Sequence, residues 1–171
     1  MNIRPLVCAL AVAIAGSGAG MANGAARAIS KSTRHLAFTA TLAPDVVTPG
    51  TKMSLAVDVR PKKGMHVYAP GTMYRPVAIA IEPNPALKVE NVIYPPPVSY
   101  LFKPLNERVL VYERPFRVTL GMTVAGTPAQ LAALTASRLI ITGQLTYQAC
   151  DATVCYLPVS MPLEWSVTIA R

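Results

Sequence analysis

The sequence predicts an all-β protein, an immunoglobulin-like antiparallel β-sandwich of about nine short strands. Apolar and polar residues alternate with a period of two through most of the chain, and the apolar positions are rich in β-branched and aromatic residues. Turn signals rich in Pro, Gly and Asn interrupt this alternation roughly every eight to twelve residues. Because no helical crossovers separate the alternating segments, a parallel α/β sheet is disfavoured.

The first five predicted strands are short alternating segments, each bounded by residues that favour turns. They occupy residues 36–42, 52–60, 65–68, 77–82 and 87–93. Turns such as Thr48-Pro49-Gly50 and Ala69-Pro70-Gly71 separate them, because Pro presets φ for a turn and Gly tolerates positive φ. Residues 29–34, before the first strand, are polar and basic, so we predict a loose N-terminal tail there.

Four more strands are predicted in the C-terminal half of the chain. They occupy residues 109–112, 116–124, 138–147 and 163–169. One short helix is predicted over 128–134, because Thr127 is a suitable cap and Pro128 suits the first helical position. We expect this helix to be a connector that covers one end of the sandwich.

The N-terminus has the layout of a secretory signal peptide. Arg4 supplies a positive charge, residues 6–15 are apolar, and small residues follow. Ala26-Arg27-Ala28 fits a cleavage site, so we expect cleavage after Ala28, with the bond after Ala22 as the main alternative. An uncleaved anchor is disfavoured because the apolar stretch is shorter than the ~20 residues a membrane span needs. We therefore predict a signal peptide, 1–28, and one periplasmic domain, 29–171, with no membrane span after cleavage.

Composition excludes several classes of protein. The chain has 171 residues, 52% of them hydrophobic, which suits one folded domain and not a disordered chain. The formal net charge is +8, but the Lys and Arg residues are scattered and form no basic stripe with interleaved aromatics. We therefore expect no nucleic-acid partner.

The strongest chemical feature is a pair of cysteines near the C-terminus. Of the three cysteines, Cys8 would leave with the signal peptide, and Cys150 and Cys155 remain, separated by four residues that suggest a loop. We expect them to form a disulfide in an oxidising compartment. Closing a loop of about six residues removes only ~2.2 kcal/mol of unfolded-state entropy, a small gain for a domain with an adequate core. From the spacing, a redox role and a structural role both remain open.

A metal site is the weaker interpretation of the same cysteines. Two thiolates with histidine can bind zinc or copper, but neither His35 nor His66 lies at a recognisable ligand spacing from the pair. Met65 and Met73 offer soft ligands for Cu(I), although Met in a strand is more often a core residue. We predict no metal and no cofactor.

Residues 147–158 around the two cysteines read Tyr-Gln-Ala-Cys-Asp-Ala-Thr-Val-Cys-Tyr-Leu-Pro. This segment resembles that of a known family, the N-terminal periplasmic domain of the transmembrane reductase DsbD. Gly64-Met65-His66-Val67-Tyr68 is similar to the family's Gly-aromatic-His-aliphatic-Tyr strand, with Met65 in place of the usual aromatic. Val92-Ile93-Tyr94-Pro95, followed by Val111-Tyr112-Glu113, is similar to its central Tyr-Pro and Val-Tyr pair. Together these motifs extend the resemblance over roughly residues 36–170.

The resemblance implies an immunoglobulin-like sandwich that passes reducing equivalents to periplasmic partners by thiol–disulfide exchange. By position, Cys150 and Cys155 would be the redox pair, and Cys155 the sulfur that forms the mixed disulfide. The family's aromatic cap loop would correspond to residues 98–103, with Tyr100 or Phe102 as the shielding ring. Tyr68 and Tyr147 fall where aromatic residues of the family line the site. Asp151, beside Cys150, should raise a thiol pKa, so control would come from access and docking.

The chain departs from DsbD in what accompanies the domain. DsbD continues into a membrane-embedded domain and a thioredoxin domain, and this 171-residue sequence contains neither. We therefore expect separate partners, either thioredoxin-like proteins or membrane thiol–disulfide reductases. Whether the protein is itself an enzyme of disulfide interchange stays open. The alternative is a non-catalytic periplasmic binding or assembly module whose disulfide is structural.

Overall fold

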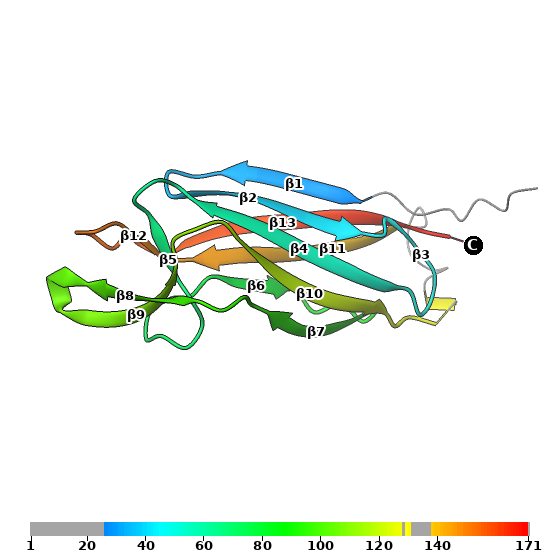
Figure 1. The fold of residues 1–171 in the computed structure, drawn as a ribbon. Helices are drawn as coiled ribbons and strands as arrows, with labels where there is room; N and C mark the ends of the chain where they lie inside the picture. The colour runs from blue at the N-terminus through cyan, green and yellow to red at the C-terminus, as the bar shows by residue number, and fades with distance from the viewer. Residues whose placement is uncertain (1–25, 128, 131–137, 171) are drawn as a thin grey trace, which may run out of the picture.

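The computed structural model describes residues 26–127, 129–130 and 138–170, and these residues form two facing β-sheets with a smaller third sheet at one end (Figure 1). The larger sheet has strand order β1-β2-β4-β10-β7, and every neighbouring pair in it is antiparallel. Its strands are β1 (Arg27–Ser32), β2 (Leu36–Ala43), β4 (Lys52–Pro61), β10 (Phe116–Val124) and β7 (Leu87–Ile93).

The second sheet covers the inner face of the first, in the order β3-β13-β11-β6. Its strands are β3 (Val46–Val47), β13 (Val159–Ile169), β11 (Arg138–Tyr147) and β6 (Ala78–Ile81). Alternate residues of both sheets point inward, as in Leu36, Phe38 and Ala40 of β2, and join one hydrophobic cluster with Ile141 and Trp165 of the second sheet. This two-layer arrangement confirms the predicted immunoglobulin-like β-sandwich.

The third sheet extends beyond the end of the sandwich and carries the cysteine segment (Figure 1). In the order β12-β5-β9-β8 it contains β12 (Ala149–Cys150), β5 (His66–Tyr68), β9 (Glu107–Tyr112) and β8 (Val98–Phe102). β8 and β9 form a hairpin whose tip includes a short 3-10 turn, η1 (Lys103–Leu105). The hairpin and the cysteine segment lie at the same end of the molecule in Figure 1.

All nine predicted strands are present, although the labelled strands run to β13. Three of them, β7, β10 and β11, have the predicted bounds. β13 begins at Val159, earlier than predicted, because it continues through Pro162. Proline has no backbone N–H, so a strand tolerates it where no neighbouring strand needs that donor. β3 pairs with β13 only at Thr168 and Ile169, so β3 needs no donor from Pro162.

The prediction of a loose tail over residues 29–34 is wrong, because residues 27–32 form β1 at the edge of the larger sheet. Only Ile29 of this strand packs against the core, so the sequence lacks the apolar alternation that would have indicated a strand. Polar contacts hold the edge instead. The Ser30 and Thr39 hydroxyls lie 2.9 Å apart, and Lys31 Nζ donates to the Pro162 carbonyl at 2.7 Å.

Two other expectations concern connecting segments. Residues 98–103, expected as a cap loop, are largely the strand β8, because Val98–Phe102 pairs with residues 107–111 of β9. The cap expected for the helix is present: Gln130 N donates to Thr127 Oγ1 at 3.3 Å, and Thr127 N donates to Gln130 Oε1 at 2.8 Å. This reciprocal pair is a capping box. Residues 128 and 131–134 of the predicted helix lie outside the described residues.

The predicted signal peptide lies almost entirely outside the described residues, which begin at residue 26. Within the described part of the chain, no helix has the length and apolar character needed to cross a membrane.

Candidate functional site

Cys150 and Cys155 form a disulfide at the β12 edge of the third sheet. β12 follows β11 after a single residue and pairs with β5, which places Cys150 opposite His66. Cys155 faces Cys150 as an antiparallel bridge, with their Cα atoms 4.0 Å apart. The side chain of Cys150 is completely buried, whereas Cys155 is partly exposed. The predicted disulfide is therefore present, and its two sulfur atoms differ in access to solvent.

The short loop between the cysteines is organised by Asp151. Its Oδ1 accepts hydrogen bonds from the backbone N–H groups of Thr153 and Val154, each at 2.8 Å, and its Oδ2 accepts one from the Tyr156 hydroxyl at 2.8 Å. These hydrogen bonds hold the pKa of Asp151 well below its usual range. The carboxylate beside Cys150 is thus ionised at neutral pH.

The hydroxyl of Tyr68 contacts both sulfur atoms. It lies 3.2 Å from Cys150 Sγ and 3.3 Å from Cys155 Sγ. Neither sulfur of a disulfide carries a hydrogen, so the phenol is the donor. Burial raises the pKa of Tyr68 to about 12, with smaller contributions from Tyr74 and Glu107, so the hydroxyl keeps its proton at neutral pH.

An aromatic cluster surrounds this contact. Tyr68, Val109, Val111 and Cys150 are its buried members, and Tyr74, Tyr100 and Cys155 pack against them. The ring of Tyr74 is stacked on the ring of Tyr68, with centroids 4.3 Å apart and an interplanar angle of 8°. The Tyr74 hydroxyl donates to Glu107 Oε2 at 2.5 Å.

The two residues expected to shield the pair both lie on β8. Tyr100 belongs to the aromatic cluster, and its ring centroid lies 4.4 Å from that of His66. Phe102 is two residues further along, on the same face of the strand, and is buried. The structure therefore brings Tyr100 to the cysteines, while Phe102 lies at the base of the hairpin tip.

Tyr147, the second tyrosine expected to line the site, packs in the main core. Its hydroxyl lies 2.7 Å from Thr33 Oγ1, and its ring meets the edge of the His35 ring at a centroid distance of 6.2 Å. His35 in turn packs against Tyr156, with centroids 4.5 Å apart. Of the two predicted tyrosines, Tyr68 contacts the sulfur atoms, and Tyr147 supports the cysteine loop from behind through His35 and Tyr156.

His66 is buried beside the disulfide, and its Nε2 has no hydrogen-bond partner. Burial lowers the pKa of His66, and the carboxylates of Glu113 and Asp151 partly oppose this effect. The imidazole is therefore neutral at neutral pH. Among the described residues, no group of three or more His, Cys, Asp or Glu side chains is arranged to hold a metal ion.

Two open hollows flank the cysteine loop. One, of about 360 Å³, is lined by Gly64, Met65, His66, Tyr100, Glu113, Arg114 and Ala152. The other, of about 400 Å³, is lined by Met73, Tyr74, Arg75, Pro76, Gln148 and Pro158. Two apolar side chains beside the site, Met73 and Leu157, are 93% and 85% exposed. The exposed end of the molecule therefore presents apolar side chains next to the partly exposed sulfur.

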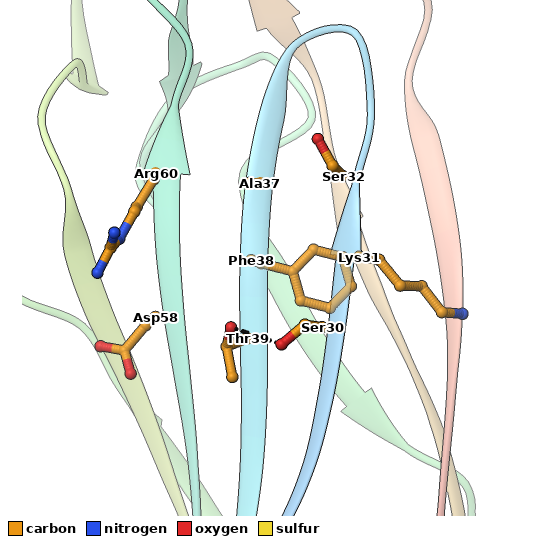
Figure 2. Close-up of a pocket in the computed structure, with 8 residues that line it drawn as sticks. All are labelled: Ser30, Lys31, Ser32, Ala37, Phe38, Thr39, Asp58 and Arg60. Atoms are coloured by element: carbon orange, nitrogen blue, oxygen red, sulfur yellow. Dashed lines mark hydrogen bonds between the residues drawn. The ribbon is translucent and has the colours of Figure 1, made fainter.

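A larger hollow, of about 610 Å³, lies away from the cysteines beside β1, β2 and β4 (Figure 2). It is lined by Ser30, Lys31, Ser32, Ala37, Phe38, Thr39, Asp58 and Arg60. Figure 2 shows hydroxyl-bearing side chains, Phe38 and the charged side chains of Lys31, Asp58 and Arg60, with no cysteine or histidine among them. This hollow is larger than the two beside the cysteine loop, but no cysteine or histidine lines it. The cysteine end therefore remains the candidate site.

Sequence reasoning missed Tyr74 and Glu107. Tyr74 lies in the connection between β5 and β6, and Glu107 begins β9. Neither belongs to a motif, and 33 residues separate them in the chain. Only the folded arrangement brings them together beside Tyr68.

Comparison with known proteins identifies one matching family model, described as thiol:disulfide interchange protein DsbD, N-terminal, over residues 32–162. Among solved structures, the reduced DsbD N-terminal domain of Neisseria meningitidis is 20% identical, with 77% of this chain and 86% of that chain covered and a TM-score of 0.49. The N-terminal periplasmic domain of ScsB from Proteus mirabilis is 13% identical, with a TM-score of 0.47. That match covers 80% of this chain but 47% of the ScsB chain, about half its length. No curated protein matches the sequence.

Proposed function

Since this chain belongs to the family of the N-terminal domain of the thiol:disulfide interchange protein DsbD, we propose that it carries electrons between periplasmic proteins by opening and closing the Cys150–Cys155 disulfide. The observation that carries the proposal is the contact of the Tyr68 hydroxyl with both sulfur atoms. A disulfide that only staples a loop needs no hydrogen-bond donor at its sulfurs. A pair that alternates between disulfide and thiolate benefits from one, because a donor stabilises the charged form.

The difference in burial supports a role for each cysteine. Cys155 is partly exposed, so it is the sulfur that an external thiolate can attack. Cys150 is completely buried and would be the leaving sulfur. This assignment agrees with the roles that the family resemblance implies for the two residues.

The exchange proceeds in two displacements. A partner thiolate attacks Cys155 Sγ, a mixed disulfide forms, the Cys150–Cys155 bond breaks, and Cys150 leaves as a thiolate that the Tyr68 hydroxyl stabilises. A second partner thiolate then attacks the partner's own sulfur in the mixed disulfide and releases Cys155. Two electrons and, after protonation of both thiolates, two protons have moved from the partner dithiol to this protein. In reverse, the Cys155 thiolate attacks a partner disulfide and Cys150 resolves the intermediate.

The proposal includes the surroundings of the pair. Tyr100, packed in the aromatic cluster, would shield the disulfide until a partner docks, with Phe102 anchoring the same strand. Residues 1–28 would direct export and 29–171 would form the periplasmic domain. Partners would be thioredoxin-like proteins or membrane thiol–disulfide reductases on other chains.

Trapping tests this function directly. A Cys150→Ala variant leaves Cys155 without its resolving partner, so incubation with periplasmic extract should give mixed disulfides that dithiothreitol releases. The matched control is Cys155→Ala, which leaves only the buried Cys150 and should trap little. Recovery of no reducible adduct by Cys150→Ala would contradict the proposal.

A redox titration separates the proposal from the alternative of a structural disulfide. An electron carrier should equilibrate with glutathione or dithiothreitol buffers at a potential above about −300 mV, whereas a structural disulfide has a lower potential. A potential below that value would favour a binding or assembly module.

A further inference from the structure

A short chain of contacts leads from the β8–β9 hairpin to the disulfide. It begins at Glu107, the first residue of β9, whose Oε2 accepts the hydrogen bond from the Tyr74 hydroxyl at 2.5 Å. Tyr74 belongs to the connection between β5 and β6, so this bond ties two segments that are distant in the chain. Glu107 also pairs with Phe102 across the hairpin. The Glu107 carboxylate therefore belongs to the β8–β9 hairpin and accepts a hydrogen bond from the connection between β5 and β6.

The chain of contacts continues through the stacked rings. Tyr74 lies parallel to Tyr68 at a centroid distance of 4.3 Å, and the edge of His66 meets Tyr68 at 6.2 Å with an interplanar angle of 88°. Because the Tyr68 ring is stacked on Tyr74 and meets the edge of His66, it has little freedom to rotate. The hydroxyl of Tyr68 is thereby kept within 3.3 Å of both sulfur atoms.

We propose that Tyr74 and Glu107 are positioning residues that hold the Tyr68 hydroxyl against the two sulfurs, so that the β8–β9 hairpin controls how well the reduced pair is stabilised as a thiolate. The inference rests on the proposed redox function of the pair. In this proposal, Tyr74 and Glu107 act on the sulfur atoms only through Tyr68. A partner that displaces the hairpin would break the Tyr74–Glu107 hydrogen bond and release the donor from the sulfurs.

The remaining charged and titratable groups near the sulfurs are a constant background. Asp151 adjoins Cys150, His66 lies opposite it on β5, Tyr100 approaches from β8, and Glu113 and Arg114 line the neighbouring hollow. Variants at Tyr74 and Glu107 leave all of these groups in place. A change in thiol acidity in Tyr74→Phe therefore reports on how Tyr74 and Glu107 hold Tyr68, whereas a variant of Glu107 also removes a negative charge that acts on Tyr68.

The test uses Tyr74→Phe, which removes the donor, and Glu107→Met, which removes the acceptor, and each keeps the approximate shape of the side chain. The rate of iodoacetamide alkylation of reduced Cys155, followed against pH by mass spectrometry, gives the thiol pKa. We expect Tyr74→Phe to raise that pKa by about half a pH unit, because the donor to the thiolate is less well placed. Glu107→Met should raise it less, because loss of the carboxylate charge by itself lowers a thiol pKa. The double variant should show the same thiol pKa as Glu107→Met, since the hydrogen bond is already absent in that variant.

The matched control is Tyr112→Phe. Its hydroxyl donates to the Pro95 carbonyl at 2.8 Å and its ring stacks on Phe116, away from the aromatic cluster of the cysteines. This variant should leave the thiol pKa of Cys155 unchanged. A pKa that moves as far in Tyr112→Phe as in Tyr74→Phe would overturn the proposal.

Two further outcomes would also overturn it. One is a thiol pKa in Tyr74→Phe equal to that of the unmodified protein while Tyr68→Phe raises it. The other is an additive effect in the double variant. Alkylation needs no partner protein, so the two proposals can fail separately. If Tyr74 and Glu107 do not position Tyr68, Cys150→Ala should still trap partners. If no partner is trapped, the effect of Tyr74→Phe on the thiol pKa can still be measured.

Discussion

The Tyr68 hydroxyl lies 3.3 Å from Cys155 Sγ and carries a hydrogen that the disulfide lacks. Tyr68 is on β5, in the middle of the third sheet, and its pKa is raised to about 12. A phenol so weakly acidic remains a donor throughout the pH range in which a thiol ionises. The site therefore pairs a sulfur that gains negative charge on reduction with a permanent hydrogen-bond donor.

Replacing Tyr68 with phenylalanine should raise the thiol pKa of Cys155 by about 1 pH unit, because a hydrogen bond to a charged group is lost. Reduction of the disulfide by a small thiol should also slow, since the leaving thiolate is less stabilised. Alkylation against pH and the rate of reduction by 2-mercaptoethanol measure these two effects. An unchanged thiol pKa would show that the hydroxyl does not stabilise the thiolate.

Removing the disulfide should cost little stability. The loop closed by Cys150 and Cys155 is short, so a double Cys→Ala variant should lose only ~2 kcal/mol of unfolding free energy. Urea denaturation of the oxidised protein and of the variant measures the difference. Failure of the variant to fold would identify the disulfide as an essential part of the structure.

Asp151→Asn should weaken the cysteine loop at neutral pH. The folded pKa of Asp151 is lowered by its hydrogen bonds, so the stabilisation is complete above the ordinary Asp pKa and is lost as pH falls toward the folded value. The variant should therefore unfold at lower urea concentration than the unmodified protein at pH 7, with the gap narrowing in acid. A gap that widens as pH falls would contradict this account.

Buried histidine should make the protein less stable in mild acid. The pKa of His66 is lowered by burial, so the unfolded chain binds more protons than the folded one below about pH 6.5. Stability should therefore fall as pH is lowered from 7.5 to 5, and less steeply in His66→Phe, which cannot titrate. Equal pH dependence in the two proteins, measured by urea midpoints, would remove His66 from this explanation. His35, whose pKa burial also lowers, would supply the residual slope.

The mature protein should begin at Ile29, after cleavage behind Ala28. β1 starts at Arg27, and its guanidinium lies 3.2 Å from the Asp45 carboxylate, so this cleavage would remove two residues of the strand and one ion pair. The loss should be small, because the Arg27 side chain is 54% exposed and exposed ion pairs contribute little. Mass spectrometry of the exported protein identifies the new N-terminus. A mass corresponding to the bond after Ala22 would select the alternative site.

Local patterns in the sequence were sufficient to predict most of the sandwich. From Val118 onward β10 alternates buried and half-buried residues, and the matching apolar alternation is visible in the sequence before any partner strand is known. No such pattern indicates β1, because this edge strand has only one inward residue, Ile29. The sequence predicts a loop in place of β8, because its two inward residues, Tyr100 and Phe102, do not make an alternation distinguishable from a turn-rich segment.

The sequence by itself determined the cysteine pair and predicted its disulfide from residue type and short spacing, and a family motif predicted Tyr68 beside the pair. Only the tertiary structure decided which other side chains meet the sulfurs. It brought Tyr74 and Glu107 together across 33 residues, and it directed Tyr147 into the core toward Thr33. The physical reason is that contacts between distant segments depend on strand pairing and sheet packing, which no local pattern along the chain records.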